Sequence, residues 1–82
     1  MNSITEYTEF LVKSLVNNQD MVSVQLFESD EEDPIVEIIV HHDDMGALIG
    51  KEGRNAKAIK TLVQAYAFLH KLPKVKVNID SF

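Results

Sequence analysis

The chain contains no cysteine among its 82 residues. It can therefore form neither disulfide bonds nor zinc–thiolate sites, which is typical of proteins from a reducing compartment. No apolar run is long enough to span a membrane, and the first residues lack the basic start of a signal peptide. A chain of this length has room for one domain with a modest core. We therefore expect a single cytoplasmic domain over residues 1–82, with no membrane association.

Basic residues are scarce in the first half of the chain. Residues 1–44 carry one basic side chain, Lys13, against eleven acidic ones, whereas residues 45–82 carry seven basic and two acidic ones. The net charge of −5 hides this division, although phosphate binding depends on the local field. A phosphate-binding surface is therefore expected in the second half. The acidic half should weaken non-specific binding and leave a modest, salt-dependent affinity.

The side-chain combinations needed for catalysis are also missing. The sequence shows no nucleophile paired with a base and no paired carboxylates in an apolar setting. The run from His41 to Asp44 resembles a metal site, but adjacent residues at a strand end should point to opposite faces, which keeps His41 and His42 apart. Asp43 or Asp44 is predicted to cap the helix that follows. The acidic segment 28–34 is predicted to be a solvated hairpin tip. We therefore expect a protein that is not an enzyme and uses no cofactor or metal.

Hydrophobic periodicity predicts the order of the secondary structure. The expected elements are a helix at 3–17, strands at 22–27 and 35–41, a short helix at 45–49, a long helix after Gly53 to about Lys71, and a strand from Val75 to Ile79. Ser3 is the predicted N-cap, with Glu6 reaching back to it. Tyr7 and Phe10 are predicted to belong to the core. The second strand is apolar on most of both faces, which places it in the interior of the sheet.

The most informative stretch is Ile49-Gly50-Lys51-Glu52-Gly53-Arg54-Asn55. Glycine can adopt positive φ and lets the backbone approach a ligand closely. The helix that begins after the second glycine turns its free N–H groups and its positive dipole end toward the loop. Lys51, Arg54, Lys57 and Lys60 add positive charge, so this stretch is predicted to hold a phosphate backbone. The glycine spacing matches neither a P-loop nor a dinucleotide fingerprint.

With its flanks, this stretch resembles the Ile-Gly-x-x-Gly signature of K-homology (KH) domains. The order α-β-β-α-α-β is similar to the type II KH fold, an α+β fold in which three helices cover one face of a three-stranded sheet. In KH domains the loop clamps about four nucleotides of a single strand. Carried over by position, the RNA-binding residues are Gly46, Ile49, Gly50, Lys51, Glu52, Gly53, Arg54, Asn55 and Lys57. Glu52 is expected to weaken binding without abolishing it.

At this length, with one free-standing domain, the chain most resembles the KhpA family of small bacterial RNA-binding proteins. That resemblance implies a cytoplasmic RNA chaperone or regulator that binds single-stranded RNA, forms a homodimer and pairs with a KhpB (EloR/Jag)-like KH protein. It also implies a role linked to cell elongation and division. The sequence does not fix the RNA target or the choice between RNA and single-stranded DNA.

The long helix leaves a second function open. Its predicted apolar face includes Ile59, Leu62, Val63, Tyr66 and Leu69, and alanines and Phe68 widen that face beyond what one sheet would bury. The surplus indicates either a partner on this helix or alanines that tolerate exposure. The alternative function is therefore a protein-interaction KH module with a vestigial RNA site, acting through a dimer or partner surface.

Overall fold

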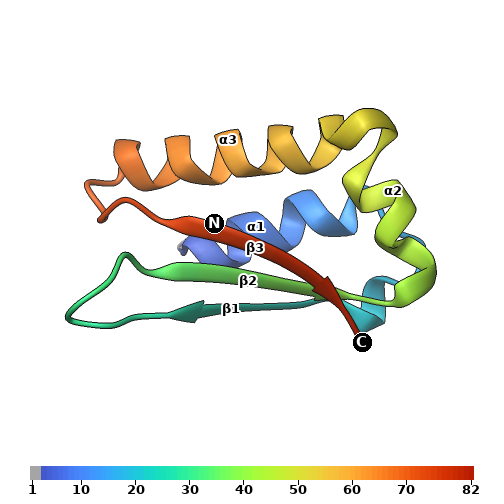
Figure 1. The fold of residues 1–82 in the computed structure, drawn as a ribbon, viewed down its shortest axis with the longest axis horizontal. Helices are drawn as coiled ribbons and strands as arrows, with labels where there is room; N and C mark the ends of the chain where they lie inside the picture. The colour runs from blue at the N-terminus through green and yellow to red at the C-terminus, as the bar shows by residue number, and fades with distance from the viewer. Residues whose placement is uncertain (1–2) are drawn as a thin grey trace.

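The computed structural model describes residues 3–82, in which the elements follow the predicted order (Figure 1). They are α1 (Ile4–Lys13), β1 (Ser23–Phe27), β2 (Ile35–Val40), α2 (Met45–Ile49), α3 (Arg54–Leu69) and β3 (Lys76–Ser81). Three short 3₁₀ turns connect them: η1 (Gln19–Met21), η2 (His42–Asp44) and η3 (Lys51–Gly53). The predicted α+β class is confirmed. Within the described residues, no helix combines the length and apolar character needed to cross a membrane.

The sheet has the strand order β1-β2-β3, so the predicted interior position of β2 is confirmed. β1 pairs with β2 in antiparallel register, from Ser23 opposite Ile39 to Phe27 opposite Ile35. β3 pairs with β2 in parallel, from Lys76 beside Ile35 to Ser81 beside Val40. Figure 1 shows α1 and α3 on the same side of this sheet, with α2 at the end where β2 finishes. The other face of the sheet is left open.

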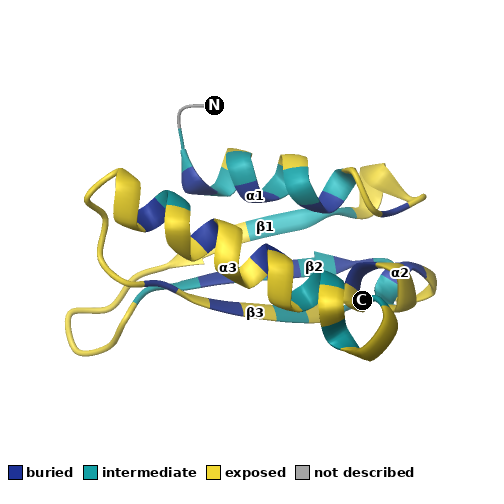
Figure 2. Cartoon of the chain, turned by 90° about the horizontal axis from the view of Figure 1, so that it is seen from above, coloured by how far each residue is buried: buried dark blue, intermediate teal, exposed yellow. Residues whose placement is uncertain are grey.

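The core lies between the sheet and the two long helices. Val36, Ile38 and Val40 of β2 are fully buried and alternate with partly exposed residues on the open face. The other buried apolar residues come from α1, α2, α3, the segment after α1, and β3 with the residue before it: Ile4, Val12, Val16, Leu48, Ile59, Val63, Ala67, Val75 and Val77. Along α3, buried and exposed residues alternate with helical periodicity (Figure 2). One stripe of each helix therefore holds it on the sheet.

α1 begins as predicted but ends four residues early. The Ser3 hydroxyl accepts a hydrogen bond from the Glu6 backbone N–H at 3.1 Å, and the Glu6 carboxylate accepts from that hydroxyl at 3.4 Å. The prediction that Phe10 is a core residue was wrong, because its side chain is 55% exposed. Tyr7 is half-buried and stacks on Tyr66 of α3, with ring centroids 4.9 Å apart. Val16 is buried beyond the end of the helix.

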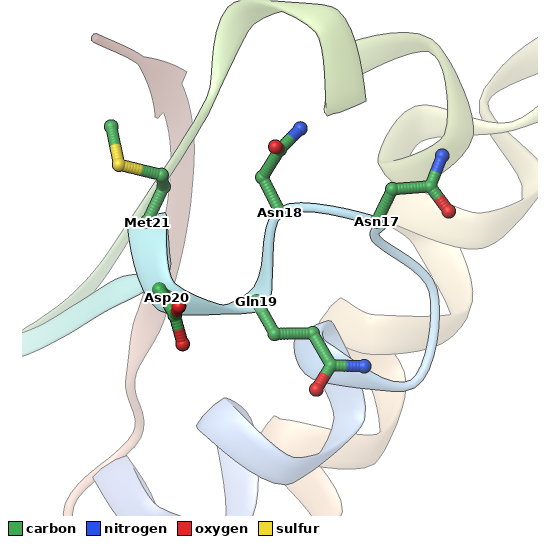
Figure 3. Close-up of a pocket in the computed structure, with 5 residues that line it drawn as sticks. All are labelled: Asn17, Asn18, Gln19, Asp20 and Met21. Atoms are coloured by element: carbon green, nitrogen blue, oxygen red, sulfur yellow. The ribbon is translucent and has the colours of Figure 1, made fainter.

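The early end of α1 is explained by Asp44. Its carboxylate accepts hydrogen bonds from the backbone N–H groups of Asn17 (3.2 Å) and Asn18 (3.0 Å) and from the Asn18 side chain (3.0 Å). Asp44 was predicted as a possible cap of α2, and it occupies that position without making a side-chain cap bond. These hydrogen bonds hold the bend after α1, where a pocket is lined by Asn17, Asn18, Gln19, Asp20 and Met21 (Figure 3). Asp44, 2% exposed, thus ties the α1–β1 connection to the start of α2.

Asp44 makes the stability of the fold depend on pH. Its pKa is lowered from the ordinary value of 3.8, chiefly by the hydrogen bond from the Asn18 backbone N–H; burial opposes this effect without overcoming it. The native carboxylate therefore binds a proton less readily than the unfolded one. Its contribution to stability is full above pH 3.8 and is lost as the pH falls through the lower folded pKa.

We expect Asp44→Asn to lower the melting temperature at pH 7, because the new side-chain NH₂ group would face the three N–H donors of Asn17 and Asn18 and cannot accept from them. The difference in melting temperature between variant and wild type should become smaller as the pH falls below 3.8, where the wild-type carboxyl becomes protonated. Thermal melts monitored by circular dichroism over pH 2–7 measure this, with the exposed neighbour Asp43→Asn as control. A difference that persists unchanged at low pH would contradict the assignment.

α3 ends two residues before the predicted position at Lys71. Lys71 adopts φ 58°, its N–H donates to the Phe68 carbonyl (3.2 Å), and the Leu72 N–H donates to the Ala67 carbonyl (2.8 Å). These are the two bonds of a Schellman motif, here with lysine at the left-handed position where glycine is usual. The helix is therefore closed by its own backbone before Pro73 is reached.

Candidate nucleic-acid interface

The turn between α2 and α3 has a left-handed backbone. Gly50 has φ 76° and ψ 175°, Glu52 has φ 58° and ψ 25°, and Gly53 has φ 75° and ψ 15°. The combination at Gly50 belongs to a region that essentially only glycine populates. The Gly50 N–H donates to the Gly46 carbonyl (2.9 Å), and the Gly53 N–H donates to the Gly50 carbonyl (3.2 Å). The positive φ predicted for the two loop glycines is confirmed.

The Asn55 side chain stabilises this turn by a hydrogen bond across it. Its side-chain amide donates to the Ala47 carbonyl of α2 at 2.9 Å and so connects the two helices on either side of the loop. A Cβ added to Gly50 would lie 2.7 Å from Asn55 Cγ, closer than real Cβ contacts. Gly50 is therefore needed for its backbone conformation and for the space that Asn55 occupies. The Asn55 side chain has a partner within the chain, which the sequence did not reveal.

The charged residues of the loop are presented to solvent. Lys51 and Glu52 lie exposed in η3, and Arg54 and Lys57 are exposed on the first turns of α3. They surround the end of α3 at which backbone N–H groups lack intrahelical partners. Three lysine or arginine charges thus lie near one helix N-terminus, with Glu52 as the only carboxylate of the segment 50–57.

α2 turns one face toward solvent and the other into the core. Leu48 is fully buried and anchors the helix. Gly46 and Ile49, three residues apart, lie on the exposed side, where Ile49 is 37% exposed and no atom lies within 4 Å of a Cβ built on Gly46. The two predicted residues therefore share a surface on the approach to the loop.

A basic groove continues from the loop along the sheet edge. Lys57, Lys60 and Gln64 follow one another on one side of α3 at spacings of three and four residues. Lys60 and Gln64 border a hollow of about 410 Å³ between α3 and β3. The hollow is lined by Asp33, Lys60, Gln64, Lys74, Val75, Lys76 and Val77.

The predicted binding residues did not include the groove lysines of the last strand, Lys74 and Lys76. Lys74 and Lys76 alternate with the buried Val75 and Val77, a pattern that predicts a basic outer strand face. This alternation is the sequence signal for a basic surface on the last strand. Only the fold places Lys76 opposite Lys60, because nothing in the sequence specifies which side of α3 lies over the edge strand.

Five of the eleven acidic residues of the first half lie away from the loop. The segment from Glu28 to Asp33 forms the exposed tip of the β1–β2 hairpin, as predicted. Figure 1 shows this tip at the opposite end of the sheet from α2 and the glycine loop. These five charges therefore oppose an anion bound at the loop only weakly, although Asp33 also lines the hollow between α3 and β3.

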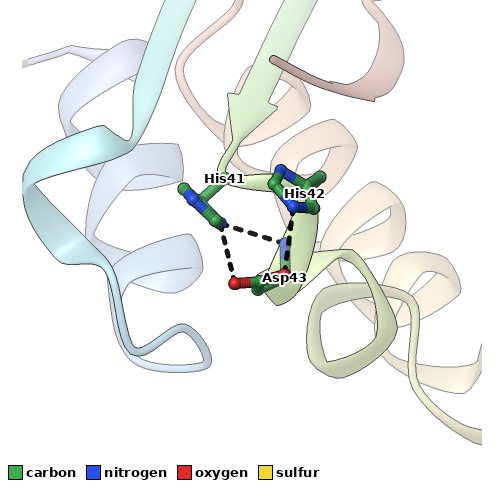
Figure 4. Close-up of side chains that lie close together, drawn as sticks. All are labelled: His41, His42 and Asp43. Atoms are coloured by element: carbon green, nitrogen blue, oxygen red, sulfur yellow. Dashed lines mark hydrogen bonds and ion pairs between the residues drawn. The ribbon is translucent and has the colours of Figure 1, made fainter.

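His41 and His42 are closer together than predicted. Their rings stack with centroids 4.4 Å apart, and both turn a nitrogen toward the Asp43 carboxylate (Figure 4). His41 Nδ1 lies 3.6 Å and His42 Nε2 lies 3.1 Å from its oxygens. The prediction that the two side chains point to opposite faces was wrong. β2 ends at Val40 and His42 begins a 3₁₀ turn, so the alternation of a strand does not apply to them.

A family model described as "KhpA/KhpB, KH domain" matches residues 5–79. The chain belongs to this KH-domain family. Proteins named "RNA-binding protein KhpA" are similar to it: that of Borreliella burgdorferi is 45% identical over 62 residues, which cover 76% of this chain and 74% of the relative. That of Clostridium perfringens is 45% identical over 74 residues, covering 90% of this chain and 96% of the relative.

The KH fold also occurs in larger proteins. The chain matches Era of Aquifex aeolicus bound to GDP·AlF₄⁻ with a TM-score of 0.62, and Era in complex with MgGDPNP and nucleotides 1506–1542 of 16S ribosomal RNA with a TM-score of 0.63. Sequence identity is 16% in both, and the match covers 96% of this chain but 30% of Era. At that identity the likeness concerns the fold alone.

Proposed function

We propose that this chain binds single-stranded RNA and has no catalytic activity. The observation that carries the proposal is the loop Gly50–Gly53, where two positive-φ glycines lead into α3 beside Lys51 and Arg54. Backbone N–H groups and cations gathered at one helix end suit a phosphate backbone. The printed names of the KhpA relatives, "RNA-binding protein", support the same function.

The bound strand would run from the loop into the basic groove. Lys51 and the first turn of α3 hold phosphates, and Lys57 leads to the groove between Lys60 and Lys76. The groove has two apolar lining residues, Val75 and Val77, and its hollow leaves room for bases beside the edge of β3. This path contacts few nucleotides, in keeping with the short footprint of KH domains.

Within the interface we assign different roles to the nine predicted residues. Lys51, Arg54 and Lys57 attract phosphates, and Gly50 and Gly53 shape the backbone. Gly46 and Ile49 provide the surface on the approach. Glu52 opposes phosphate by roughly a kcal/mol or less, because it is exposed. Asn55 acts by positioning the loop through its bond to Ala47.

The wider setting follows from the family. We propose that residues 1–82 work as one cytoplasmic KH domain that needs no cofactor. As a KhpA-like RNA chaperone or regulator, it would serve processes linked to cell elongation and division. The KH family is one of binding modules, which agrees with a role without catalysis.

The proposal is tested by fluorescence anisotropy of a labelled single-stranded RNA titrated with the full chain at low and at physiological salt. We expect saturable binding that weakens steeply with salt, with a logarithmic slope of about −0.7 per phosphate contacted. A DNA strand of the same sequence tests whether the 2′-hydroxyl is read. Folded protein that binds neither strand at low salt would contradict the proposal.

A second function is supported by the outer side of α3. Ala58, Leu62, Ala65 and Leu69 recur at helical spacing and are all exposed, Leu62 by 43% and Leu69 by 75%. Small residues between leucines let another helix approach closely. We propose that this stripe forms a homodimer contact and also serves a KhpB (EloR/Jag)-like KH partner.

We expect Leu62→Asp to convert a dimer into a monomer that still melts cooperatively, because Leu62 is not a core residue. A buried, unpaired carboxylate in the interface should weaken association at least about 100-fold, or 3 kcal/mol. Sedimentation velocity and light scattering against concentration measure the change.

Phe68→Asp is the matched control. Phe68 is 82% exposed and six residues from Leu62, so it lies on a different side of α3, beside Leu72 and Val75. Loss of the dimer in this variant alone would move the interface to that side. A monomeric wild type would remove the homodimer from the proposal and leave RNA binding untouched.

A further inference from the structure

We propose that His41, His42 and Asp43 bind one divalent transition-metal ion of the zinc class at the turn between β2 and α2. These three side chains are not needed for RNA binding, and the RNA proposal stands or falls independently of them. Each offers one ligand atom, and the three atoms all lie within 4.8 Å of one another.

The distances suit a small ion. His42 Nε2 lies 3.1 Å from one Asp43 oxygen and His41 Nδ1 lies 3.6 Å from the other. Zinc binds imidazole nitrogen and carboxylate oxygen at about 2.0–2.2 Å, so two ligands of a tetrahedral ion lie about 3.3 Å apart. Figure 4 shows a nitrogen of each ring turned toward the Asp43 carboxylate. Because the two rings are stacked, they must rotate out of this arrangement before both nitrogens can point at one ion.

The ligand types decide the class of metal. Two imidazoles and one carboxylate match the sets that hold zinc with a fourth position open to water. Magnesium and calcium prefer oxygen ligands and would gain little from the imidazoles. His42 and Asp43 have side chains 68% and 70% exposed, so an ion reaches them directly from solvent.

Binding also has a local cost. In the protein without metal, His41 Nδ1 accepts a hydrogen bond from the Asp43 backbone N–H at 3.0 Å. An ion at His41 must replace that bond, and exposed side chains lose freedom when they bind it. We therefore expect micromolar rather than tighter affinity. The bound ion would stabilise the first residues of η2, which precede Asp44, α2 and the glycine loop along the chain.

Isothermal titration of ZnCl₂ into the full chain, prepared without a histidine tag, tests the proposal. We expect one ion per chain for wild type, and an affinity reduced about tenfold or more for His42→Ala and for Asp43→Asn. His70→Ala is the matched control, since His70 is the third histidine of the chain and lies at the end of α3. It should bind zinc as wild type does.

The site would be overturned by no saturable binding to wild type, by unchanged binding in His42→Ala, or by an equal loss in His70→Ala. A stoichiometry of one ion per two chains would also overturn it as a site within one chain. Should a variant fail to fold, proton NMR of the wild-type imidazoles decides: zinc should shift the His41 and His42 resonances and leave those of His70 in place.

Discussion

Replacing Lys51 and Glu52 together by aspartate should raise the dissociation constant for single-stranded RNA by about tenfold or more at physiological salt. The loop then loses its one lysine, and two carboxylates face the phosphates at a distance where each unit charge matters by about 1 kcal/mol. The logarithmic salt slope should also become shallower by about one phosphate contact. Anisotropy titrations at several salt concentrations measure both quantities.

The same variant should keep its fold. Both side chains are exposed, and Glu52 already has φ 58°, a conformation that aspartate adopts more readily than most residues. Lysine ion pairs within residues 3–82 involve Lys13 and Glu9 but not Lys51, so no salt bridge is lost. A melting curve beside the binding curve separates lost affinity from lost structure. A lower melting temperature with unchanged RNA affinity would contradict a phosphate role for the loop.

Lys13→Asp makes a suitable control because it changes the net charge by the same amount. Lys13 is the last residue of α1 and belongs neither to the glycine loop nor to the residues that line the groove between α3 and β3. A general electrostatic effect would weaken binding equally in both variants. We expect a much smaller loss for Lys13→Asp. Equal losses would mean that the net charge of the chain, not the loop, governs affinity.

Gly50→Ala should be the most destabilising of the three glycine-to-alanine changes, at about 2–4 kcal/mol. The backbone at φ 76° and ψ 175° strains any L-residue by about 1–3 kcal/mol. The new Cβ also lies 2.7 Å from Asn55 Cγ, which must move and give up its bond to Ala47. That bond contributes about 0.5–1.5 kcal/mol. For a domain of this size the melting temperature should fall by about 8 °C or more.

The other two glycines provide graded controls. Gly53→Ala meets no atom within 4 Å, so only its left-handed backbone matters and the cost should be about 1–2 kcal/mol. Gly46→Ala also meets open space but lies in α2, where alanine should stabilise by about 0.5–1 kcal/mol. In thermal melts, the melting temperature should be highest for Gly46→Ala, lower for Gly53→Ala and lowest for Gly50→Ala. Equal effects at Gly50 and Gly53 would show that Asn55 adapts freely.

Local rules predicted the backbone of the interface well. The bounds of α2 from the sequence, Met45 to Ile49, are those of the structure, and both loop glycines have the positive φ that was expected. These features depend on neighbours along the chain. Helix starts, turns and strand alternation are set by residues a few positions apart, which a sequence displays directly.

The errors concern contacts between distant residues. α1 was predicted to continue to residue 17, but Asp44, 26 or 27 positions away, captures the amides that would have extended it. Phe10 has the spacing of a core residue yet faces away from the sheet. For the same reason the sequence did not reveal the partner of Asn55 or the position of Lys60 opposite Lys76. Hydrophobic spacing shows that a side chain can be buried, but not which surface will cover it.

The parallel pairing of β2 with β3 also determines at which stage of folding the nucleic-acid interface is completed. The Asn78 side chain reaches Glu37 across 41 positions, and the whole β2–β3 register has this separation, about half of the chain. Such non-local pairing is slow, because a large loop must close before any contact compensates for it. The β1–β2 hairpin and α3 can form early from local contacts, but the groove exists only once β3 has docked. A chain still emerging from the ribosome would carry the glycine loop without its groove, so RNA capture awaits synthesis of β3.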